Sequence, residues 1–482
     1  MSTKQPAHLK RDAGADGSES FRDSISTVDK QGKRIWVYPR KSHGKFTTWR
    51  SRFGYALLTL LFVGPFIKIG GEPLLMINLV DRRFVFFGQS FWPQDFVIFV
   101  IGFITFIIFV ALFTVAFGRL FCGWACPQTV FMDQVFRRIE HIIEGDWKQR
   151  QQLDKGPLTG DKIRKKTLKH LVFFGISFLI GNTFLAYIIG SDMLIRTITE
   201  PASEHMVGLS AMFAFSGVFY ANFAFFREQA CTTVCPYGRL QGVLLDRKSI
   251  VIAYDHVRGE PRGLFRKGEE RAAAGKGDCV DCRACVHECP TGIDIRNGTQ
   301  LECVNCTACI DACDNMMRGV GLPTGLIRFA SESEIADKQP FRFNTRMKAY
   351  TAVLGVLVGV LVTLIALRTD TDSTLLRAPG MLFQTEPDGR ISNLDFLKVL
   401  NKSHHHLPVR FELLDREGEV RLVGKPLDLE PGALGQSELF VVLPKGGLDG
   451  MKTKLMLGVY SGDRLLEKVS TSFVGPMNIP GS

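Results

Sequence analysis

The chain has 482 residues, which is long enough for two or three domains, and its formal net charge at pH 7 is +11. Hydrophobic residues make up 46% of it and phenylalanine alone contributes 38 residues, so the composition predicts membrane spans. The basic balance does not indicate nucleic-acid binding, because the Lys and Arg residues flank apolar runs, as they do in membrane proteins.

Residues 1–52 are predicted to form a basic cytoplasmic arm. This stretch is polar and carries 12 Lys or Arg residues. It lacks apolar periodicity up to about Lys30, so we expect it to be partly disordered. No apolar run lies near Met1, and we therefore expect the first apolar helix to direct membrane insertion without a cleavable signal.

A helix needs about 20 apolar residues to cross the hydrocarbon core of a bilayer, and five segments are candidates. The first, residues 53–67, is the weakest, because it is short and contains Pro65. The other four are uncharged over 19 to 22 residues and cover 96–117, 171–190, 207–226 and 349–367. We predict a four-helix membrane domain over 53–226 and a fifth transmembrane helix over 349–367.

The distribution of Lys and Arg predicts how these segments are oriented. The arm carries 12 and the connection 118–170 carries 11, whereas the loops 68–95 and 191–206 carry 3 and 1. Because positively charged loops stay in the cytoplasm, we expect a cytoplasmic N-terminus and five spans in a bacterial inner membrane. The segment between the fourth and fifth spans is then cytoplasmic, and the chain beyond Arg368 is periplasmic.

Two of the predicted spans end in the same motif, Cys-x3-Cys-Pro, which indicates an internal repeat. Cysteines four residues apart lie on one face of a helix, and the proline favours a helix end nearby. Two thiols from each motif would offer up to four soft sulfur ligands at the cytoplasmic boundary, and such ligands favour copper in its +1 state. Basic neighbours, Arg119 and Arg227, would help to keep the thiols ionised. The cysteines are Cys122, Cys126, Cys231 and Cys235.

These four cysteines have a simpler alternative interpretation, since small apolar cysteines also pack at helix ends. One cysteine would fit that role, but two matched pairs, each followed by proline, favour a redox or metal role. Other chemistry is disfavoured. No histidine lies within an apolar segment, which argues against a membrane haem with two axial histidines. A nucleotide cofactor has no support from a glycine-rich or Walker motif.

Besides Cys231 and Cys235, the segment 227–348 contains eight cysteines in two runs of the form Cys-x2-Cys-x2-Cys-x3-Cys. Bacterial ferredoxins with two four-iron clusters have this spacing, and the fourth cysteine of each run binds the other cluster. Zinc usually takes two more widely separated Cys-x2-Cys pairs, and disulfides do not suit a reducing compartment. We therefore predict a ferredoxin-type domain with two [4Fe-4S] clusters, one held by Cys279, Cys282, Cys285 and Cys313 and the other by Cys303, Cys306, Cys309 and Cys289.

Residues 368–482 differ in character from the rest of the chain. Val409 and Phe411 alternate with polar neighbours, and similar short runs with turn signals follow. This pattern predicts a small antiparallel β-sandwich of immunoglobulin-like type, without the usual disulfide because the segment has no cysteine. We interpret it as a periplasmic binding or scaffolding domain. Adjacent histidines seldom converge on one ion, so an exposed loop is the favoured interpretation of His404, His405 and His406.

With these motifs the chain resembles the FixG/RdxA/CcoG family of cytochrome c oxidase accessory proteins. The resemblance covers nearly all of the chain. It rests on the paired Cys-x3-Cys-Pro motifs, the phrase Phe91-Trp-Pro-Gln-Asp95, the two-cluster unit, the late span and the C-terminal immunoglobulin-like domain. It implies a role in biogenesis of the cbb-type copper–haem oxidase, as a membrane cupric reductase that supplies Cu(I). By this resemblance the eight ferredoxin cysteines hold iron and the four membrane-edge cysteines handle copper.

Together these inferences predict a multi-pass α-helical inner-membrane protein that accepts electrons in the cytoplasm and reduces Cu(II) to Cu(I). Copper would be its substrate or a transiently bound ion. The expected partners are a cytoplasmic electron donor, a copper chaperone or transporter, oxidase subunits and membrane lipid, but no nucleic acid. Two alternatives stay open. One is a quinol dehydrogenase-type electron-transfer subunit, and the other is a non-catalytic redox sensor or assembly scaffold.

Overall fold

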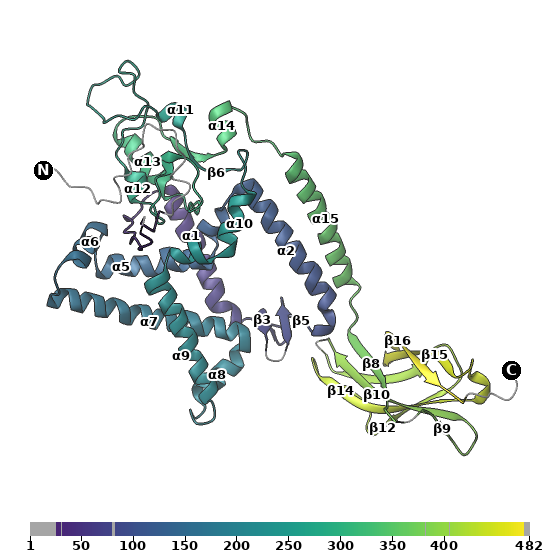
Figure 1. The fold of residues 1–482 in the computed structure, drawn as a ribbon. Helices are drawn as coiled ribbons and strands as arrows, with labels where there is room; N and C mark the ends of the chain where they lie inside the picture. Colours follow the sequence, from purple (N-terminus) through teal and green to yellow (C-terminus); the bar gives the residue numbers. More distant parts are fainter. Residues whose placement is uncertain (1–25, 30, 80–81, 381, 404, 477–482) are drawn as a thin grey trace. The chain divides into compact units, whose positions relative to one another are not determined.

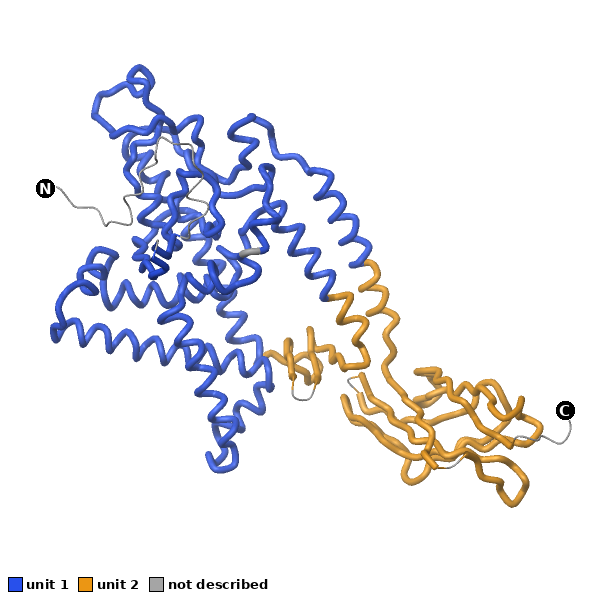
Figure 2. Tube along the Cα trace, in the orientation of Figure 1, with its two compact units in different colours: residues 1–65, 103–358 blue, residues 66–102, 359–482 orange. Residues whose placement is uncertain are grey.

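The computed structural model describes residues 26–29, 31–79, 82–380, 382–403 and 405–476. The chain separates into two compact units, which Figure 2 distinguishes by colour. Unit 1 comprises residues 1–65 and 103–358, and unit 2 comprises 66–102 and 359–482. The boundary between the units runs through the two long helices α2 (Phe96–Phe117) and α15 (Thr345–Ala366).

Within the described part of the chain, four helical segments are long and apolar enough to cross a membrane. They are Pro93–Phe117, which contains α2, Gly160–Ile189 (α7), Met206–Phe226, which contains α9 (Met206–Ala221), and Thr345–Ala366 (α15). These four match the four strong segments of the sequence. The chain is therefore a multi-pass membrane protein by helix length and composition.

The weak first segment, 53–67, is not one of these four. It falls on α1 (Lys45–Val63), whose first two turns are polar and charged. A 3₁₀ turn that contains Pro65 follows at Gly64–Phe66, because proline lacks the N–H that would continue the helix. The apolar part of α1 is therefore shorter than the prediction required.

Short helices join the long ones in unit 1 (Figure 1). π-Helical stretches interrupt them at Phe131–Phe136, Asn222–Phe226 and Ala230–Val234. The helix α7 begins eleven residues before the predicted span, where Thr159 caps it by accepting a hydrogen bond from the Lys162 N–H. The short helices are α3 (Leu120–Trp124), α4 (Pro127–Val130), α5 (Arg137–Ile143), α6 (Trp147–Lys155), α8 (Ser191–Thr199) and α10 (Pro236–Leu244).

Phenylalanine rings form the centre of the helical core of unit 1. Phe136 stacks on Phe223 with 4.5 Å between ring centroids, and Phe173 meets Phe136 edge-on at 4.8 Å. All three side chains are almost completely buried. Because lipid is as apolar as these side chains, close ring packing rather than the hydrophobic effect stabilises the association of such helices.

The cysteine-rich segment forms a module of loops, short helices and one small sheet. Its two strands, β6 (Val251–Tyr254) and β7 (Ile327–Ala330), pair antiparallel. Residues 26–48 of the predicted arm pack on this module: the Arg40 N–H donates to the His287 carbonyl, and Asp311 accepts from the Phe46 and Thr47 N–H groups. The module's helices are α11 (His256–Gly259), α12 (Ala284–His287), α13 (Ala308–Gly319) and α14 (Glu332–Asp337).

In unit 2, the loop before α2 forms strands that the sequence analysis did not predict. A hairpin pairs β1 (Lys68–Ile69) with β2 (Glu72–Pro73). A second, three-stranded sheet follows, and Asp95 beside α2 is buried in ion pairs at 2.9 Å with both Arg368 and Lys402. The aspartate of the sequence motif Phe91–Asp95 is thus the residue that forms both ion pairs. The sheet contains β3 (Leu75–Asn78), β4 (Arg83–Phe86) and β5 (Gln89–Phe91).

The C-terminal part of unit 2 is the predicted β-sandwich. One sheet has the order β12-β14-β10-β8 with β9 beside β10, and the other has the order β13-β11-β15-β16. Alternate residues such as Val409, Leu439 and Leu457 point into its apolar core. The strands are β8 (Thr371–Arg377), β9 (Gln384–Thr385), β10 (Ile391–Asn401), β11 (Leu407–Leu413), β12 (Glu419–Val423), β13 (Leu427–Leu429), β14 (Leu434–Leu443), β15 (Lys452–Ser461) and β16 (Arg464–Val474).

Candidate metal centres

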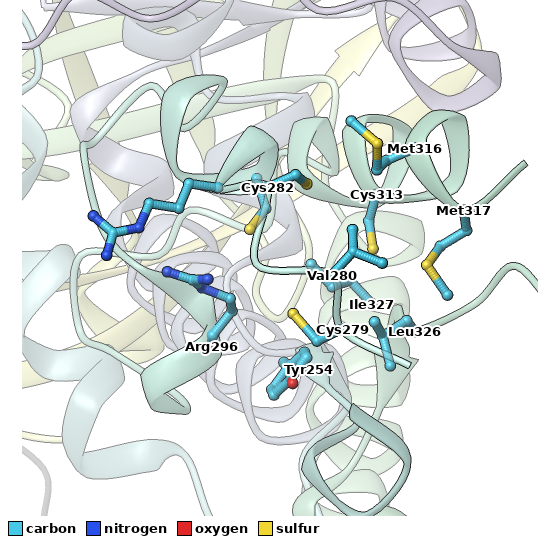
Figure 3. A pocket seen from close by; sticks show the side chains of 12 residues that line it. Tyr254, Cys279, Val280, Cys282, Arg296, Cys313, Met316, Met317, Leu326 and Ile327 are labelled. Atoms are coloured by element: carbon cyan, nitrogen blue, oxygen red, sulfur yellow. The ribbon is translucent and has the colours of Figure 1, made fainter. Parts of the chain in front are cut away.

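The ferredoxin-type module contains two cavities, one lined by four cysteines and the other by five, and each draws its cysteines from both runs. Figure 3 shows the first cavity, where Cys279 and Cys282 come from one run and Cys313 from the other. Cys285 completes this set, which we call the first cysteine group. Its apolar wall includes Met317 and Ile327, while Cys282 is exposed to solvent.

The second cavity is lined by Cys289, Cys303, Cys306 and Cys309, which we call the second cysteine group. Cys285 reaches this cavity as well, so the two cavities adjoin. Apolar side chains of Ile252, Ile293 and Ile295 form its wall. Apart from Cys285, which lines both cavities, the cysteines fall into the two crossed sets that were assigned from the spacing. The assignment of each set to one cluster stays a prediction.

The backbone of the two runs bends in the same way. Asp281 and Arg283 in the first run, and Asn305 and Thr307 in the second, have positive φ angles between 50° and 68°. These pairs occupy equivalent positions between the first three cysteines of each run, where Asp and Asn tolerate the left-handed region better than most residues. The left-handed bends turn successive cysteines toward one cavity instead of along a helix.

The donor set fits a four-iron cluster in each cavity. Each has four sulfur donors and an apolar wall, and no cysteine of the chain is in a disulfide. Burial raises the pKa of the Cys303 and Cys313 thiols to about 12, so metal binding must displace their protons. Neither two separated zinc sites of the paired type nor a disulfide framework matches this grouping.

The two Cys-x3-Cys-Pro motifs have the same backbone conformation. A left-handed residue stands four positions before the first cysteine of each pair: Gly118 at φ 58° and Arg227 at φ 55°. The second cysteine of each pair is extended and caps the next helix, which begins with proline. This match gives structural support to the internal repeat.

The expectation that each pair lies on one helix face is wrong. The helix α3, which contains Cys122, ends at Trp124, and the π-helix Ala230–Val234, which contains Cys231, ends one residue before Cys235. The chain leaves the helix before the second cysteine because proline disfavours a helical conformation for the residue that precedes it. Proline therefore starts the next helix after each pair.

The expectation that arginines keep these thiols ionised is also wrong. Burial raises the pKa of Cys231 to about 12, and the neighbouring Cys126, Cys122 and Cys235 raise it further, against a smaller opposite effect of Arg119. Burial likewise raises the pKa of Cys126. The Cys126 and Cys231 thiols therefore hold their protons until a metal replaces them.

The four thiols are close to one another without converging on one point. Among the described residues, only Glu200, Glu204 and His205 bring three ligand atoms within 4.8 Å of one another. Cys126 and Cys122 of the first motif raise the pKa of Cys231 more than Cys235 of its own motif does, so thiols of the two motifs lie near one another. His405 and His406 are exposed, as expected, and His404 lies outside the described residues.

The first motif packs directly on the loop that carries the second cysteine group. Cys122 shares a small buried core with Val304, Cys306 and Ala308. A Cβ atom on Gly123 would lie 2.3 Å from the Val304 carbonyl oxygen, so only glycine allows this approach. The contact is held in place by the Arg50 Nε, which donates to the Gly123 carbonyl at 2.7 Å.

The same loop is contacted by the residues that precede Cys122. Arg119 donates to the Leu301 carbonyl, and a Cβ atom on Gly118 would lie 3.0 Å from the Asn305 side chain. The sequence analysis named Arg119 for its charge but missed Gly118 and Gly123 as contact residues. A glycine inside a cysteine motif is the signal that could have indicated close backbone approach.

The second motif is anchored by buried charges instead. Arg227 donates to Glu140 through two nitrogens, at 2.6 and 2.8 Å, and Arg150 donates to the same carboxylate at 2.6 Å. Glu228 pairs with Arg137 at 3.4 Å. Burial opposes ionisation of Glu140, but the arginines hold its pKa well below the ordinary value. The sequence analysis gave no role to Glu140, since a buried glutamate in a basic segment leaves no local pattern.

Three family models match parts of the chain. The model "4Fe-4S dicluster domain" covers residues 226–332, and "4Fe-4S binding domain" covers 98–148. The model described as "IG-like fold at C-terminal of FixG" covers 361–476, and its description groups FixG with the oxidoreductases. The matches support the ferredoxin-type module and the immunoglobulin-like domain.

Full-length relatives extend these matches over most of the chain. It is 33% identical to "Nitrogen fixation protein FixG" of Rhizobium meliloti (strain 1021), covering 86% of this chain and 87% of that protein. It is 34% identical to "Protein RdxA" of Cereibacter sphaeroides, covering 86% and 90%. "Protein RdxB" of the same organism is 34% identical over 77% and 80%.

One solved structure is also similar, the "Crystal structure of FixG-related protein from Vibrio parahaemolyticus". It covers 22% of this chain and 97% of that one, at 18% identity and a TM-score of 0.19.

The four apolar helices, the dicluster module and the C-terminal domain define a membrane iron–sulfur protein with an immunoglobulin-like β-sandwich. Proteins of this class differ in what they reduce or oxidise, so the class alone does not fix the reaction. The relatives fix the family. The chain belongs to the FixG/RdxA family, in which FixG is also called CcoG.

Proposed function

We propose that the protein is a membrane cupric reductase that supplies Cu(I) for assembly of the copper site of a cbb-type cytochrome c oxidase. Membership of the FixG/RdxA family supports the link to the oxidase. The four membrane-edge thiols support copper as the substrate, because soft sulfur ligands favour Cu(I) over Cu(II). Each copper ion takes one electron, and the protein loses that electron.

In this proposal the first and second cysteine groups each hold one [4Fe-4S] cluster. When bound, the two clusters supply one-electron oxidation and reduction, which matches the single electron that Cu(II) takes up. The cysteine thiolates would hold the iron, and the apolar walls would limit the access of water to the sulfur atoms other than that of the exposed Cys282.

One observation carries the proposal: Cys122 lies in the same buried core as Cys306. A thiol in this position is placed where an electron can pass between the second cysteine group and a bound copper ion. The approach also depends on Gly123, which touches the Val304 backbone. This contact joins the proposed copper thiols to the second cysteine group without an intervening solvent layer.

The exposure of the two groups indicates where electrons arrive. Cys282 of the first group is exposed, whereas Cys306 and Cys309 of the second are buried. We therefore place the docking site of the cytoplasmic electron donor at the first group. A copper chaperone or transporter and oxidase subunits are the partners that the function would require.

The orientation is part of the proposal and has its own test. We propose that the N-terminus and the ferredoxin-type module lie in the cytoplasm and that the C-terminal domain lies in the periplasm. A reporter that is active only in the periplasm should be active when fused after Ser482 and silent when fused after Lys267. Activity at Lys267 would place the cysteine groups outside and contradict a cytoplasmic donor.

The copper thiols are tested with two double variants, Cys122→Ser/Cys126→Ser and Cys231→Ser/Cys235→Ser. Serine is nearly isosteric but is a hard, poorly ionised ligand, so copper binding and Cu(II) reduction should be lost. Iron content, about eight per chain, should stay near the wild-type value. The assay is anaerobic Cu(II) reduction by the reconstituted protein with a Cu(I)-specific chelator. If both variants reduce Cu(II) at the wild-type rate, the thiols are structural, and quinol oxidation becomes the next activity to assay.

A further inference from the structure

A large cavity in unit 1 lies outside both cysteine groups. It measures about 790 Å³ and lies where the N-terminal arm, the start of α1 and the helix α5 meet. Pro290 and Ala308, which follow Cys289 and precede Cys309, form part of its wall. Neither the copper thiols nor any cluster cysteine lines it. Its chemistry is therefore separate from the proposed reaction.

The lining of this cavity has an excess of positive charge. Six Arg or Lys residues face three carboxylates, Asp133, Asp146 and Glu288. Asp133 is already paired with two of the cations, at 2.5 Å with Arg50 and 2.7 Å with Arg137. The four remaining cations, which we call the basic set, are Arg40, Lys41, Arg52 and Arg138.

The basic set has no acidic partner within 4.0 Å among the residues that the structure describes. Arg138 donates only to neutral oxygens, at 2.7 Å to both the Ser51 hydroxyl and the Gln134 amide, and to the Tyr55 hydroxyl. Four guanidinium or ammonium groups around one cavity repel each other, and an anion between them would relieve that repulsion.

The surroundings of the cavity indicate the source of the anion. Trp49 and Tyr55 on α1 are about half exposed, at 56% and 46%, and Phe53 beside them is 45% exposed. Amphipathic Trp and Tyr side chains are enriched where a protein meets lipid headgroups. Basic pockets beside membrane helices bind anionic lipid headgroups in the same way.

We propose that this cavity binds a phosphate-bearing anion, and that the basic set recognises the headgroup of an anionic phospholipid. The phosphate accepts hydrogen bonds from the guanidinium groups, and the acyl chains extend along the exposed aromatic face of α1. A free phosphate compound has the same charged group and differs from the lipid in having no acyl chains. The test therefore separates the two sources.

The test uses the full-length, delipidated protein in a neutral detergent. Phosphatidylglycerol is added to the micelles, phosphatidylcholine serves as the zwitterionic comparison, and bound lipid is counted by native mass spectrometry. The variant Arg40→Gln/Lys41→Gln/Arg52→Gln removes three cations of the basic set. At about fivefold for each cation near an anionic headgroup, binding should weaken roughly 100-fold.

A matched variant removes the same charge elsewhere. Lys338→Gln/Arg342→Gln/Lys348→Gln changes three exposed cations near the start of α15, which do not line the cavity. This variant should bind phosphatidylglycerol like the wild type. Because neither variant alters a cysteine, the iron content of both should be unchanged, and this measurement also shows that the module is folded.

Each outcome decides between the possibilities. Preferential binding of phosphatidylglycerol, lost only in the cavity variant, supports the lipid headgroup. Displacement of the lipid by soluble pyrophosphate, with the same dependence on the basic set, supports phosphate recognition but assigns a soluble source. Equal losses in both triple variants, or equal binding of phosphatidylcholine, would overturn the proposal.

Discussion

The two Cys-x3-Cys-Pro motifs have the same backbone features at their two ends but differ in the residues that they contact. Each follows a left-handed residue and each ends in a cysteine that caps a helix starting with proline. The first motif packs through Gly123 on the loop of the second cysteine group. The second is fixed by the pairing of Arg227 with Glu140. The internal repeat thus provides two pairs of thiols, and the residues that surround the two pairs differ.

We infer from this difference that the thiols of the two motifs, although chemically alike, differ in their role in electron transfer. Cys122 shares a buried core with Cys306, whereas Cys231 lines a small cavity together with Pro290 and Val304 of the same cysteine group's loops. The Arg227 side chain, by contrast, is surrounded by ion pairs that fix the position of Cys231. We therefore expect both motifs to bind copper and the first to receive the electron.

The largest effect is expected from breaking the support of the second motif. Replacing Glu140 by Gln leaves the buried Arg227 and Arg150 without their shared carboxylate. Removing one partner of a buried ion pair costs about 3–5 kcal/mol, because the remaining charge stays desolvated. We expect a lower midpoint of thermal unfolding for the detergent-solubilised variant. It is measured by the change in intrinsic tryptophan fluorescence on heating.

The pH dependence of this stabilisation has a definite sign. The arginines hold the folded-state pKa of Glu140 far below its ordinary value of 4.5. The ion pair therefore contributes fully at neutral pH, and its contribution is lost as the pH falls below about 4 toward the folded-state pKa. The difference in midpoint between wild type and Glu140→Gln should shrink in that range. A constant difference would show that the arginines do not lower the folded-state pKa of Glu140.

A smaller effect, on rate alone, is expected from breaking the contact of the first motif. The Cβ of Gly123→Ala would collide with the Val304 carbonyl oxygen and push the motif away from the second cysteine group. Residues that support metal ligands from outside typically change activity by about 10–100-fold, so Cu(II) reduction should slow within that range. Copper binding, measured by equilibrium dialysis, should stay near the wild-type value.

Two control variants show whether the effect of Gly123→Ala is local. Thr232→Ala changes the equivalent residue of the second motif, directly after Cys231, and should leave the rate unchanged. Gly175→Ala adds the same methyl group to a helix with no atom within 4 Å, and it should also be neutral. If either control slows Cu(II) reduction as much as Gly123→Ala does, the rate reflects general strain and not the contact with Val304.

The parts of the molecule that could be predicted from the sequence are those with a regular local pattern of residues. The spacing of the eight cysteines indicated two sets, and the alternation of Val409 and Phe411 indicated the sandwich. The four strong spans follow from uncharged runs of sufficient length. Each of these patterns is written in adjacent residues, so no knowledge of distant contacts was needed.

The parts that sequence reasoning missed depend on contacts between distant residues. The contact of Gly123 with Val304 joins positions 181 residues apart, and Arg227 meets Glu140 across 87 residues. The ionisation of Cys231 was predicted wrongly because Arg119 and Arg227 were counted without the burial of the thiol. Arg227 is in fact occupied by Glu140, so its charge is not available to the thiols.

The central claim is that the second cysteine group, through Cys122, delivers electrons to copper. It is tested with Cys279→Ser, which removes the cluster of the first group, and Cys303→Ser, which removes that of the second. Each variant is reduced anaerobically, freed of reductant and mixed once with Cu(II) and a Cu(I)-specific chelator. Iron content, about four per chain, and EPR of the remaining cluster confirm that each variant retains one reducible site.

The account predicts that Cys279→Ser forms about one Cu(I) per chain at the wild-type rate, because its remaining cluster is the one beside Cys122. Cys303→Ser should keep its reduced EPR signal and form Cu(I) far more slowly. Equal rates in the two variants, or faster formation in Cys303→Ser, would contradict the claim that the contact between Cys122 and Cys306 carries the function.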